Sequence, residues 1–168
     1  MRGMRVVNRH ERLIPAPVHV VGALIDTLSG PNDALWPRSH WPAMRFPGPL
    51  QPDISGGHGP IHYSIKSYTP GRAIVFQFTR PLGFNGTHEF VVQAGPGGSL
   101  LSHSLVMLTS GSATLGWLLV FRPLHDALIE DSLALASCSA GSPVAAPAWS
   151  WRVRLLRRLF RRRRSRAT

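Results

Sequence analysis

The sequence has one cysteine, Cys138, and few acidic residues. A single thiol can form neither an internal disulfide nor a thiolate cluster for zinc. All eight Asp and Glu residues lie before residue 132, whereas nine of the 19 Lys and Arg residues lie between Arg152 and Arg166. The formal charge of +11 is therefore concentrated in the tail, and residues 1–148, with ten basic and eight acidic side chains, are nearly neutral. The charge thus does not indicate a nucleic-acid-binding body.

The sequence also lacks a long apolar run. The most apolar stretch, "ATLGWLLVF" at 113–121, is too short to span a bilayer and ends at Arg122. The first 14 residues contain no apolar segment of the length that a signal peptide needs. We therefore expect a cytoplasmic protein with no transmembrane segment, and its 168 residues suit one domain.

The first third of the chain predicts one strand and one or two helices. "RVVNRHERLI" at 5–14 is typical of a strand that ends at a proline. Residues 15–28 place apolar side chains at three- and four-residue steps after two prolines, which predicts an amphipathic helix. A short second helix is expected around 33–41, followed by a loop over 43–60 with one short strand near 44–46.

Two hairpins follow, and turn chemistry sets their registers. "TPGR" at 69–72 has the type II pattern, which places Ile65 opposite Phe76 and Tyr63 opposite Phe78. These apolar residues define the inner face, so His62 is expected to point outward. In the second hairpin, around "GPGG" at 95–98, one register pairs Phe90 with His103 and His88 with Leu105. The inner face of that hairpin then holds His88, Phe90, Val92, Leu101, His103, Leu105 and Met107.

The C-terminal part of the body predicts one long helix. Trp117, Phe121, Leu124 and Leu128 lie at helical spacing, and Pro123 is expected to bend the helix. Arg122 and Asp126 lie four residues apart, which suits an ion pair on a solvated face. The order of strand, helices, antiparallel meander and long helix defines an α+β fold.

This order resembles the helix-grip fold of the START-like (SRPBCC) superfamily, whose branches include pollen-allergen-type (Bet v 1-like) proteins and polyketide cyclases. The resemblance lies in "GHGPIHYSIKSYTPGRAIVFQF", "GTHEFVVQAGPGGSLLSHSL" and "WLLVFRPLHDALIEDSLALA", and it covers residues 5–136. It is strongest to the polyketide-cyclase-like bacterial branch. It implies a curved antiparallel sheet wrapped around the C-terminal helix, with a hydrophobic cavity between them. It implies no catalytic residue, because the superfamily has no single catalytic motif.

The inner faces of the sheet and helix supply the candidate ligand site. The inward histidines, His88 and His103, have three possible roles, as cavity wall, in ligand recognition, or as an acid–base pair. Trp41, in an aromatic and proline-rich segment, is expected either at the cavity mouth or in helix-to-sheet packing. The candidate ligand-binding residues are Tyr63, Phe76, Phe78, His88, Phe90, His103, Leu105, Met107, Trp117, Phe121, Leu124 and Trp41.

No metal or other cofactor is expected. "GGHGPIHY" at 56–63 places His58 and His62 four residues apart, but its glycines and proline exclude the helix that would bring both rings together. His58 is expected in a flexible loop that enters the sheet. The sequence contains no HExxH or CxxC motif for zinc.

The end of the chain divides into a linker and a basic tail. Residues 137–148 are small and proline-rich, which indicates a flexible linker between a domain at 1–136 and a tail at 149–168. The tail interleaves apolar and arginine side chains as in an interfacial helix that binds anionic lipid. Nucleic-acid binding and a solvated tail are the alternatives. The candidate membrane-contacting residues are Trp149, Trp151, Leu155, Leu156, Leu159, Phe160, Arg157 and Arg158.

Three functions follow from these features. The first is binding of a hydrophobic or aromatic small molecule, lipid or polyketide-like, by a protein that docks peripherally at the inner membrane face. The second is a polyketide cyclase or dehydrase that uses His88 or His103 as acid–base. The third is an interaction protein similar to the Hsp90-activator branch, which would need no cavity. The sequence does not define the oligomeric state.

Overall fold

A computed structural model describes residues 3–164, with side-chain surroundings given for residues 3–160; the last four residues of the expected tail, 165–168, lie outside the described part. The strands are β1 (Met4–Ile14), β2 (Ser55–His58), β3 (Ile61–Thr69), β4 (Ala73–Arg80), β5 (Phe84–Gly95) and β6 (Gly98–Thr109). The helices are α1 (Val18–Asp26), α2 (Ser112–Gly116), α3 (Arg122–Ser139) and α4 (Trp151–Arg164), and a π-helical turn, η1 (Trp117–Phe121), joins α2 to α3.

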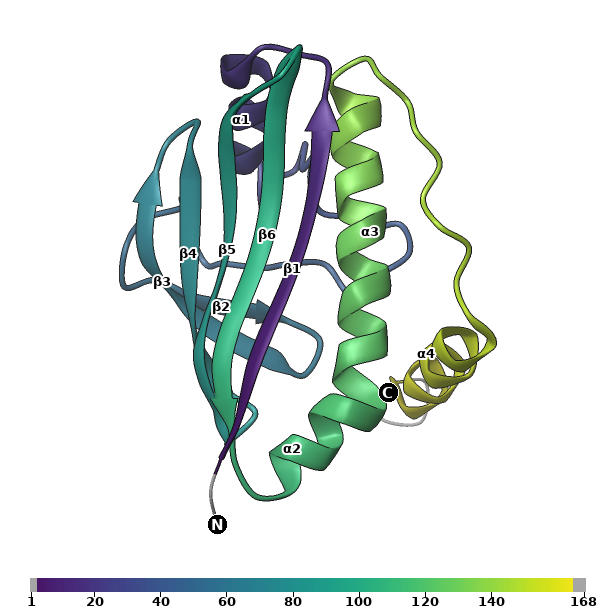
Figure 1. Ribbon diagram of the computed structural model, residues 1–168. Coiled ribbons are helices and arrows are strands. Elements are labelled where there is room, and N and C mark those ends of the chain that lie inside the picture. Colours follow the sequence, from purple (N-terminus) through teal and green to yellow (C-terminus); the bar gives the residue numbers. More distant parts are fainter. Residues whose placement is uncertain (1–2, 165–168) are drawn as a thin grey trace.

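The strands form one antiparallel sheet in the order β1-β6-β5-β4-β3-β2, shown in Figure 1. The predicted pairs Tyr63 with Phe78 and Ile65 with Phe76 are confirmed, and a bulge after Ile65 shifts the register toward the turn. The pairs Phe90 with His103 and His88 with Leu105 are also confirmed. The inner face of the sheet therefore carries the apolar residues and histidines that parity assigned to it.

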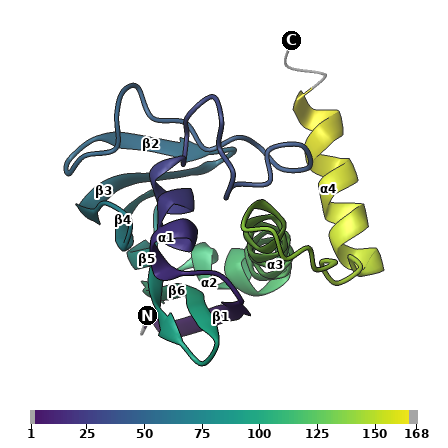
Figure 2. The same cartoon turned by 90° about the horizontal axis from the view of Figure 1, so that it is seen from above.

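The helices lie against one face of this sheet. Figure 2 shows α1 and α3 on the same side, with α4 on the far side of α3 from the sheet. Buried side chains of α1 and α3, among them Ile25, Leu128 and Leu133, belong to the same hydrophobic core as the inward residues of the strands. The α+β class is therefore confirmed. No helix in residues 3–164 is long and apolar enough to cross a membrane.

The expected bend before α3 is present and has a local cause. Pro123 has no N–H to donate to the carbonyl of Leu119 one turn earlier. The chain widens into the π-helical turn Trp117–Phe121 at this point. The guanidinium of Arg152, in α4, donates hydrogen bonds to the carbonyls of Leu119 at 2.8 Å and Leu118 at 3.3 Å. An arginine from α4 thus supplies the donor that the proline lacks.

The segment between α1 and β3 differs from the prediction. Residues 33–41 form turns rather than a second helix, because Asp33 accepts the backbone N–H groups of Leu35 and Trp36. The short strand lies at Ser55–His58 rather than at 44–46, where only Arg45 forms a bridge, with Gly57. A Cβ at position 56 would lie 2.2 Å from the Arg45 carbonyl oxygen, so the glycine allows the close approach.

Two further boundaries matter for the site. His58 was expected in a flexible loop, and that expectation is wrong, because His58 is the last residue of β2 and pairs with Ile61. Helix α3 continues to Ser139, into the segment expected to be linker. Residues 143–150 then form neither helix nor strand and lead to α4.

Candidate ligand-binding cleft

A cleft of about 1150 Å³ opens between the inner face of the sheet, the bent helix and the segment that precedes β2. Its outer part is lined by exposed residues, among them Arg38, Arg45 and His62. Its inner part is lined by buried residues, among them Phe84 and Trp117, which are 4% and 3% exposed. The cleft therefore leads from a polar mouth to an aromatic floor.

Six histidines line this cleft, and the rings of four of them, His58, His88, His103 and His125, form a row across it. Nδ1 of His58 shares a 3.0 Å hydrogen bond with the Tyr63 hydroxyl, and the Tyr63 ring lies 4.9 Å from the ring of His88. The ring centroids of His88 and His103 are 5.5 Å apart, and those of His103 and His125 are 5.0 Å apart. The histidines thus come from β2, β5, β6 and α3 and meet inside the fold.

These histidines are neutral at physiological pH because they are buried. Burial lowers the pKa of His58 to about 3 and holds the pKa values of His88 and His103 well below the usual range. Burial also lowers the pKa of His125, against the opposing effect of the neighbouring Asp126 carboxylate. The inner wall therefore carries polar atoms without a positive charge, which favours an uncharged ligand.

The inward histidines have unused hydrogen-bonding capacity. Among the described residues, Nε2 of His88, Nδ1 of His103 and both ring nitrogens of His125 have no hydrogen-bond partner. Neighbouring side chains cover these atoms, since each exposes less than 1 Å². A ligand in the cleft therefore first meets ring faces and edges, and it must displace neighbours to bond these nitrogens.

The structure divides the candidate ligand-binding residues into two groups. Eight line the cleft: Trp41, Phe78, His88, His103, Leu105, Trp117, Phe121 and Leu124. Four are buried in the core without lining it: Tyr63, Phe76, Phe90 and Met107. The outward orientation expected for His62 agrees with its exposed position at the mouth.

The candidate ligand-binding residues left out further residues that line the cleft, among them Trp36, His58, Phe84 and His125. His125 lies four residues after Phe121 and three before Leu128, so the helical spacing already placed it on the inner face. His58 had no such signal, because a glycine-rich segment has no alternation of apolar and polar residues. The ring of Trp36 lies against that of His58 at an angle of 54°, with ring centroids 4.6 Å apart, and Trp36 donates its indole N–H to the Pro42 carbonyl.

One side of helix α4 packs beside the mouth of the cleft. The indole N–H groups of Trp41 and Trp149 both donate to Oδ2 of Asp131, at 2.7 and 3.0 Å. The Arg157 guanidinium lies 3.7 Å from the Trp149 ring centre and 4.3 Å from that of Trp41, and it donates to the His40 carbonyl. Arg157 and Phe160 line the cleft. Helix α4 thus forms part of the cleft wall.

The other side of α4 faces away from the body. Trp151 is 77% exposed, and Leu155 and Leu159 are each 49% exposed. Arg154 and Arg158 are exposed on the same side. The candidate membrane-contacting residues are therefore divided, with Trp151, Leu155, Arg158 and Leu159 outward and Trp149, Leu156, Arg157 and Phe160 half-buried against the body.

Several solved structures have a fold similar to that of this chain. The di-domain ARO/CYC protein StfQ of the steffimycin biosynthetic pathway superposes with a TM-score of 0.60 at 15% identity, over 82% of this chain and 51% of its own. KanY gives 0.60 at 12% identity, over 82% of this chain and 99% of its own. Ara h 8.0201 gives 0.54 at 13% identity, over 82% of this chain and 97% of its own. The chain thus spans about half of StfQ and nearly all of the other two.

These similarities confirm the expected fold. The chain has the START-like, helix-grip arrangement, in which a curved antiparallel sheet packs against a long C-terminal helix. No family model matches the sequence. No curated protein matches it either.

Proposed function

We propose that the protein binds an uncharged hydrophobic or aromatic small molecule in the cleft. The observation that carries the proposal is a cleft of about 1150 Å³ whose inner wall consists of aromatic rings, leucines and neutral histidines. This volume is at or above the upper end of the range that drug-sized ligands occupy. An interaction protein that works through its outer surface would not need such a cleft, so the third sequence-based hypothesis has less support.

The chemistry of the wall supports an aromatic ligand. Phe78, Phe84 and Trp117 offer ring faces and edges, and the neutral histidines add rings of similar shape with polar edges. The structural likeness to the ARO/CYC protein StfQ supports a polyketide-like compound, as the resemblance in sequence implied. A flat polycyclic compound with few polar groups would suit this lining.

Co-purification tests the proposal. Full-length protein, purified without detergent, is analysed by native mass spectrometry and then extracted with organic solvent. We expect an adduct of a few hundred daltons that is released by the solvent and absorbs in the near ultraviolet. If the protein carries no adduct and also fails to take up polycyclic aromatic compounds added at micromolar concentration, the proposal is wrong.

Catalysis on the bound ligand is the second candidate function. One observation favours it: His125, in the cleft wall, has Nδ1 3.7 Å from Oδ1 of Asp126. His88 and His103 have weaker support as an acid–base pair, because neither forms an ion pair or hydrogen bond with a carboxylate among the described residues. If His125 is the catalytic residue, His125→Ala should lose turnover of an identified ligand. If His88 and His103 act as the acid–base pair that the sequence suggested, His88→Ala or His103→Ala should lose it.

We also propose that the outward face of α4 docks the protein on an anionic membrane surface. Trp151, Leu155 and Leu159 lie at successive turns of the helix, with Arg154 and Arg158 beside them. The sequence continues with arginines at 161–164. Interfacial helices combine such an apolar stripe with basic flanks. Docking at the inner face of the membrane would place the cleft mouth, which α4 borders, near the lipid.

Vesicle flotation tests the membrane proposal. Full-length protein is mixed with vesicles of phosphatidylcholine alone or with about a third phosphatidylglycerol. We expect flotation with the anionic vesicles only, and its loss in the double variant Leu155→Ser with Leu159→Ser. Leu115→Ser, which replaces a leucine that is 59% exposed in α2, is the matched control and should keep binding. Equal flotation of both variants, or binding to DNA without binding to vesicles, contradicts the proposal.

A further inference from the structure

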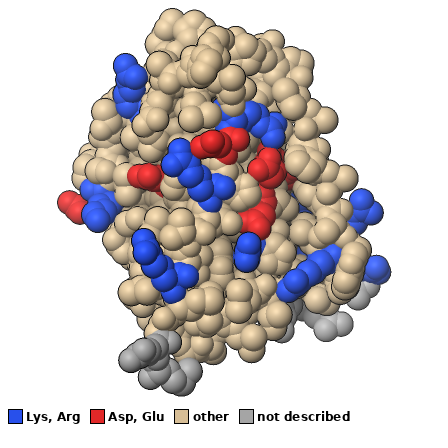
Figure 3. Space-filling model, viewed as in Figure 1, with Lys and Arg blue, Asp and Glu red and all other residues tan. Residues whose placement is uncertain are grey.

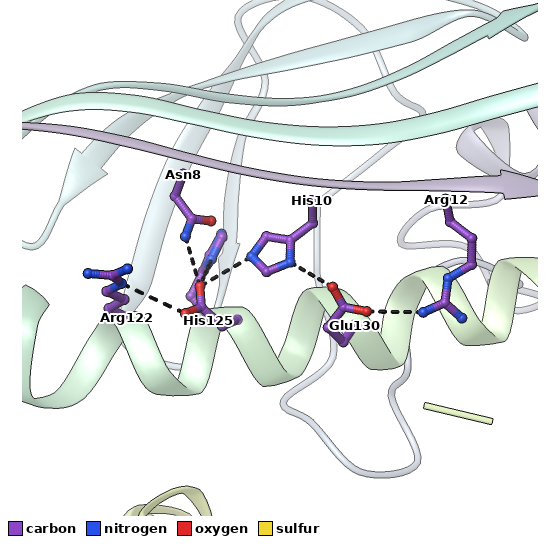
Figure 4. A network of polar contacts seen from close by, with 7 residues as sticks. Asn8, His10, Arg12, Arg122, His125 and Glu130 are labelled. Carbon is purple, nitrogen blue, oxygen red and sulfur yellow. Dashed lines mark hydrogen bonds and ion pairs between the residues drawn. The ribbon is translucent and has the colours of Figure 1, made fainter. Parts of the chain in front are cut away.

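Two histidines and a carboxylate meet where β1 runs alongside α3, on the side of the sheet that the helices cover (Figure 4). Nε2 of His10 lies 3.2 Å from Oδ1 of Asp126, and Nδ1 of His125 lies 3.7 Å from the same oxygen. The ligand atoms of the three residues all lie within 4.8 Å of one another. They are half-buried, with side chains 15%, 16% and 36% exposed for His10, His125 and Asp126.

A second layer of contacts orients His10. Nδ1 of His10 lies 2.7 Å from Oε1 of Glu130, and Oε2 of Glu130 accepts a 3.0 Å hydrogen bond from Arg12. Figure 4 shows His10 between Glu130 on one side and the Asn8 and His125 side chains on the other. Histidines that bind metal usually donate their second ring N–H to a carboxylate in this way, which fixes the ring and its tautomer.

The contact between His10 and Asp126 can hold either a proton or a metal ion. When Nδ1–H is donated to Glu130, a neutral His10 ring presents the lone pair of Nε2 to a carboxylate oxygen 3.2 Å away. Two acceptors at that distance repel each other unless a proton or a metal ion lies between them. His125 adds a third donor atom, and its ring nitrogens have no hydrogen-bond partner among the described residues.

We propose that His10, His125 and Asp126 form a binding site for a divalent transition metal ion, with Zn²⁺ as the representative ion. Two imidazole nitrogens and one carboxylate oxygen suit zinc and neighbouring ions such as Co²⁺, whereas Mg²⁺ and Ca²⁺ prefer oxygen ligands throughout. No local pattern in the sequence indicates this site, because residues 10 and 125 are brought together only by the packing of α3 on β1.

Two arginines limit the affinity of this site. Nε of Arg122 lies 3.8 Å from Oδ2 of Asp126, and Arg12 bonds to Glu130. Figure 3 shows acidic side chains gathered over β1 and α3, with basic side chains around them. Arg122 contacts the Asp126 oxygen that does not face the histidines and is 57% exposed, so it can move away. We therefore expect binding of moderate strength that improves when Arg122 is removed.

Calorimetric titration of the full-length protein with ZnCl₂ tests the site, and Co²⁺ absorption gives the coordination. We expect one Zn²⁺ per chain, with affinity falling about tenfold or more in His10→Ala and Asp126→Asn. His19→Ala and Asp53→Asn, at exposed positions outside the cluster, are the matched controls and should bind as the parent does. Arg122→Ala should bind Zn²⁺ more tightly, a gain that misfolding cannot produce.

Three results would overturn the proposal. The first is that no Zn²⁺ binds at about 100 µM metal, a concentration at which even a site far weaker than structural zinc sites would be occupied. The second is that His19→Ala loses as much binding as His10→Ala. The third is that Arg122→Ala gains no affinity. The second result would instead indicate adventitious binding at surface histidines. Circular dichroism of each variant shows whether the fold is retained.

Discussion

Nδ1 of His88 lies 3.4 Å from Nε2 of His103, inside the fold and away from any carboxylate partner among the described residues. Because both rings are neutral, only one of these two nitrogens carries the shared proton. The remaining nitrogens, Nε2 of His88 and Nδ1 of His103, must then be one donor and one acceptor, whichever tautomer is present. A ligand hydroxyl or carbonyl that reached them would meet a complementary pair.

The burial of this pair predicts that stability falls at acidic pH. In the folded protein the pKa of His88 lies well below the usual value because of burial. Below about pH 6.5 the unfolded chain binds a proton at His88 that the folded chain does not, so protonation favours unfolding. The stabilisation is complete above that pH and is lost as the pH falls. Urea denaturation between pH 7.5 and pH 4.5 measures this dependence.

A variant isolates the contribution of His88. His88→Phe keeps a ring that can pack on Phe76 and Phe78, whose ring centroids each lie 4.8 Å from His88. Its loss of stability with falling pH should be weaker than that of the parent by up to about 1.4 kcal/mol per pH unit. His10 has the opposite effect on stability as the pH falls, because its pKa is raised, chiefly by its hydrogen bond with Asp126. Both parent and variant contain His10, so its effect cancels in the comparison. Parallel pH profiles for parent and variant would contradict the prediction.

The contact between Arg152 and the bend of the helix predicts an energetic coupling with Pro123. Arg152→Ala should reduce the free energy of unfolding by about 1 kcal/mol, because it leaves the Leu119 carbonyl without its donor. In a Pro123→Ala background the new backbone N–H can bond that carbonyl, so Arg152→Ala should cost less. A double-mutant cycle by urea denaturation measures the difference. A coupling energy of zero would show that Arg152 does not replace the missing donor.

The stacking of Arg157 predicts that one arginine holds α4 against the body. Arg157→Ala removes the cation that lies over the Trp41 and Trp149 rings, a contact worth about 1–2 kcal/mol. Helix α4 should then detach more often, and trypsin should cleave within 151–164 several times faster. Arg158→Ala removes one exposed trypsin site as well, so it is the matched control and should be cleaved at the parent's rate. Equal rates for the two variants would contradict this role.

The sheet was predictable from the sequence because turn chemistry and alternation act over short distances. "GPGG" predicts the register of β5 with β6, and "TPGR" predicts the pairs of β3 with β4 from Ile65 away from the turn, although the bulge after Ile65 shifts the pairs nearest the turn. Parity then placed His88 and His103 inside. The segment around His58 was not predictable, since its conformation depends on a glycine that lets the Arg45 backbone approach. Local sequence pattern therefore predicts the hairpins, whereas the segment before β3 depends on contacts between residues that are distant in the sequence.

The candidate site shows the same division. Helical periodicity identified Trp117, Phe121 and Leu124 as inward residues and would have identified His125 as well. In α4 the pattern showed two kinds of side chain but not which side packs on the body. The side that packs is set by Asp131, which accepts hydrogen bonds from the indole N–H groups of Trp41 and Trp149, and by the contact of Arg157 with both rings. These contacts join distant parts of the chain, so the local sequence does not indicate them.

The most direct test of the proposed function fills the cleft. Leu124→Trp places a larger ring in the cleft wall, whereas Leu115→Trp adds the same ring at a position that is 59% exposed and does not line the cleft. Fluorescence titration with a neutral, fluorescent polycyclic aromatic compound measures binding. We predict saturable binding to the parent and to Leu115→Trp, with affinity reduced at least tenfold in Leu124→Trp. Equal binding by all three proteins, or no binding by the parent, would contradict it.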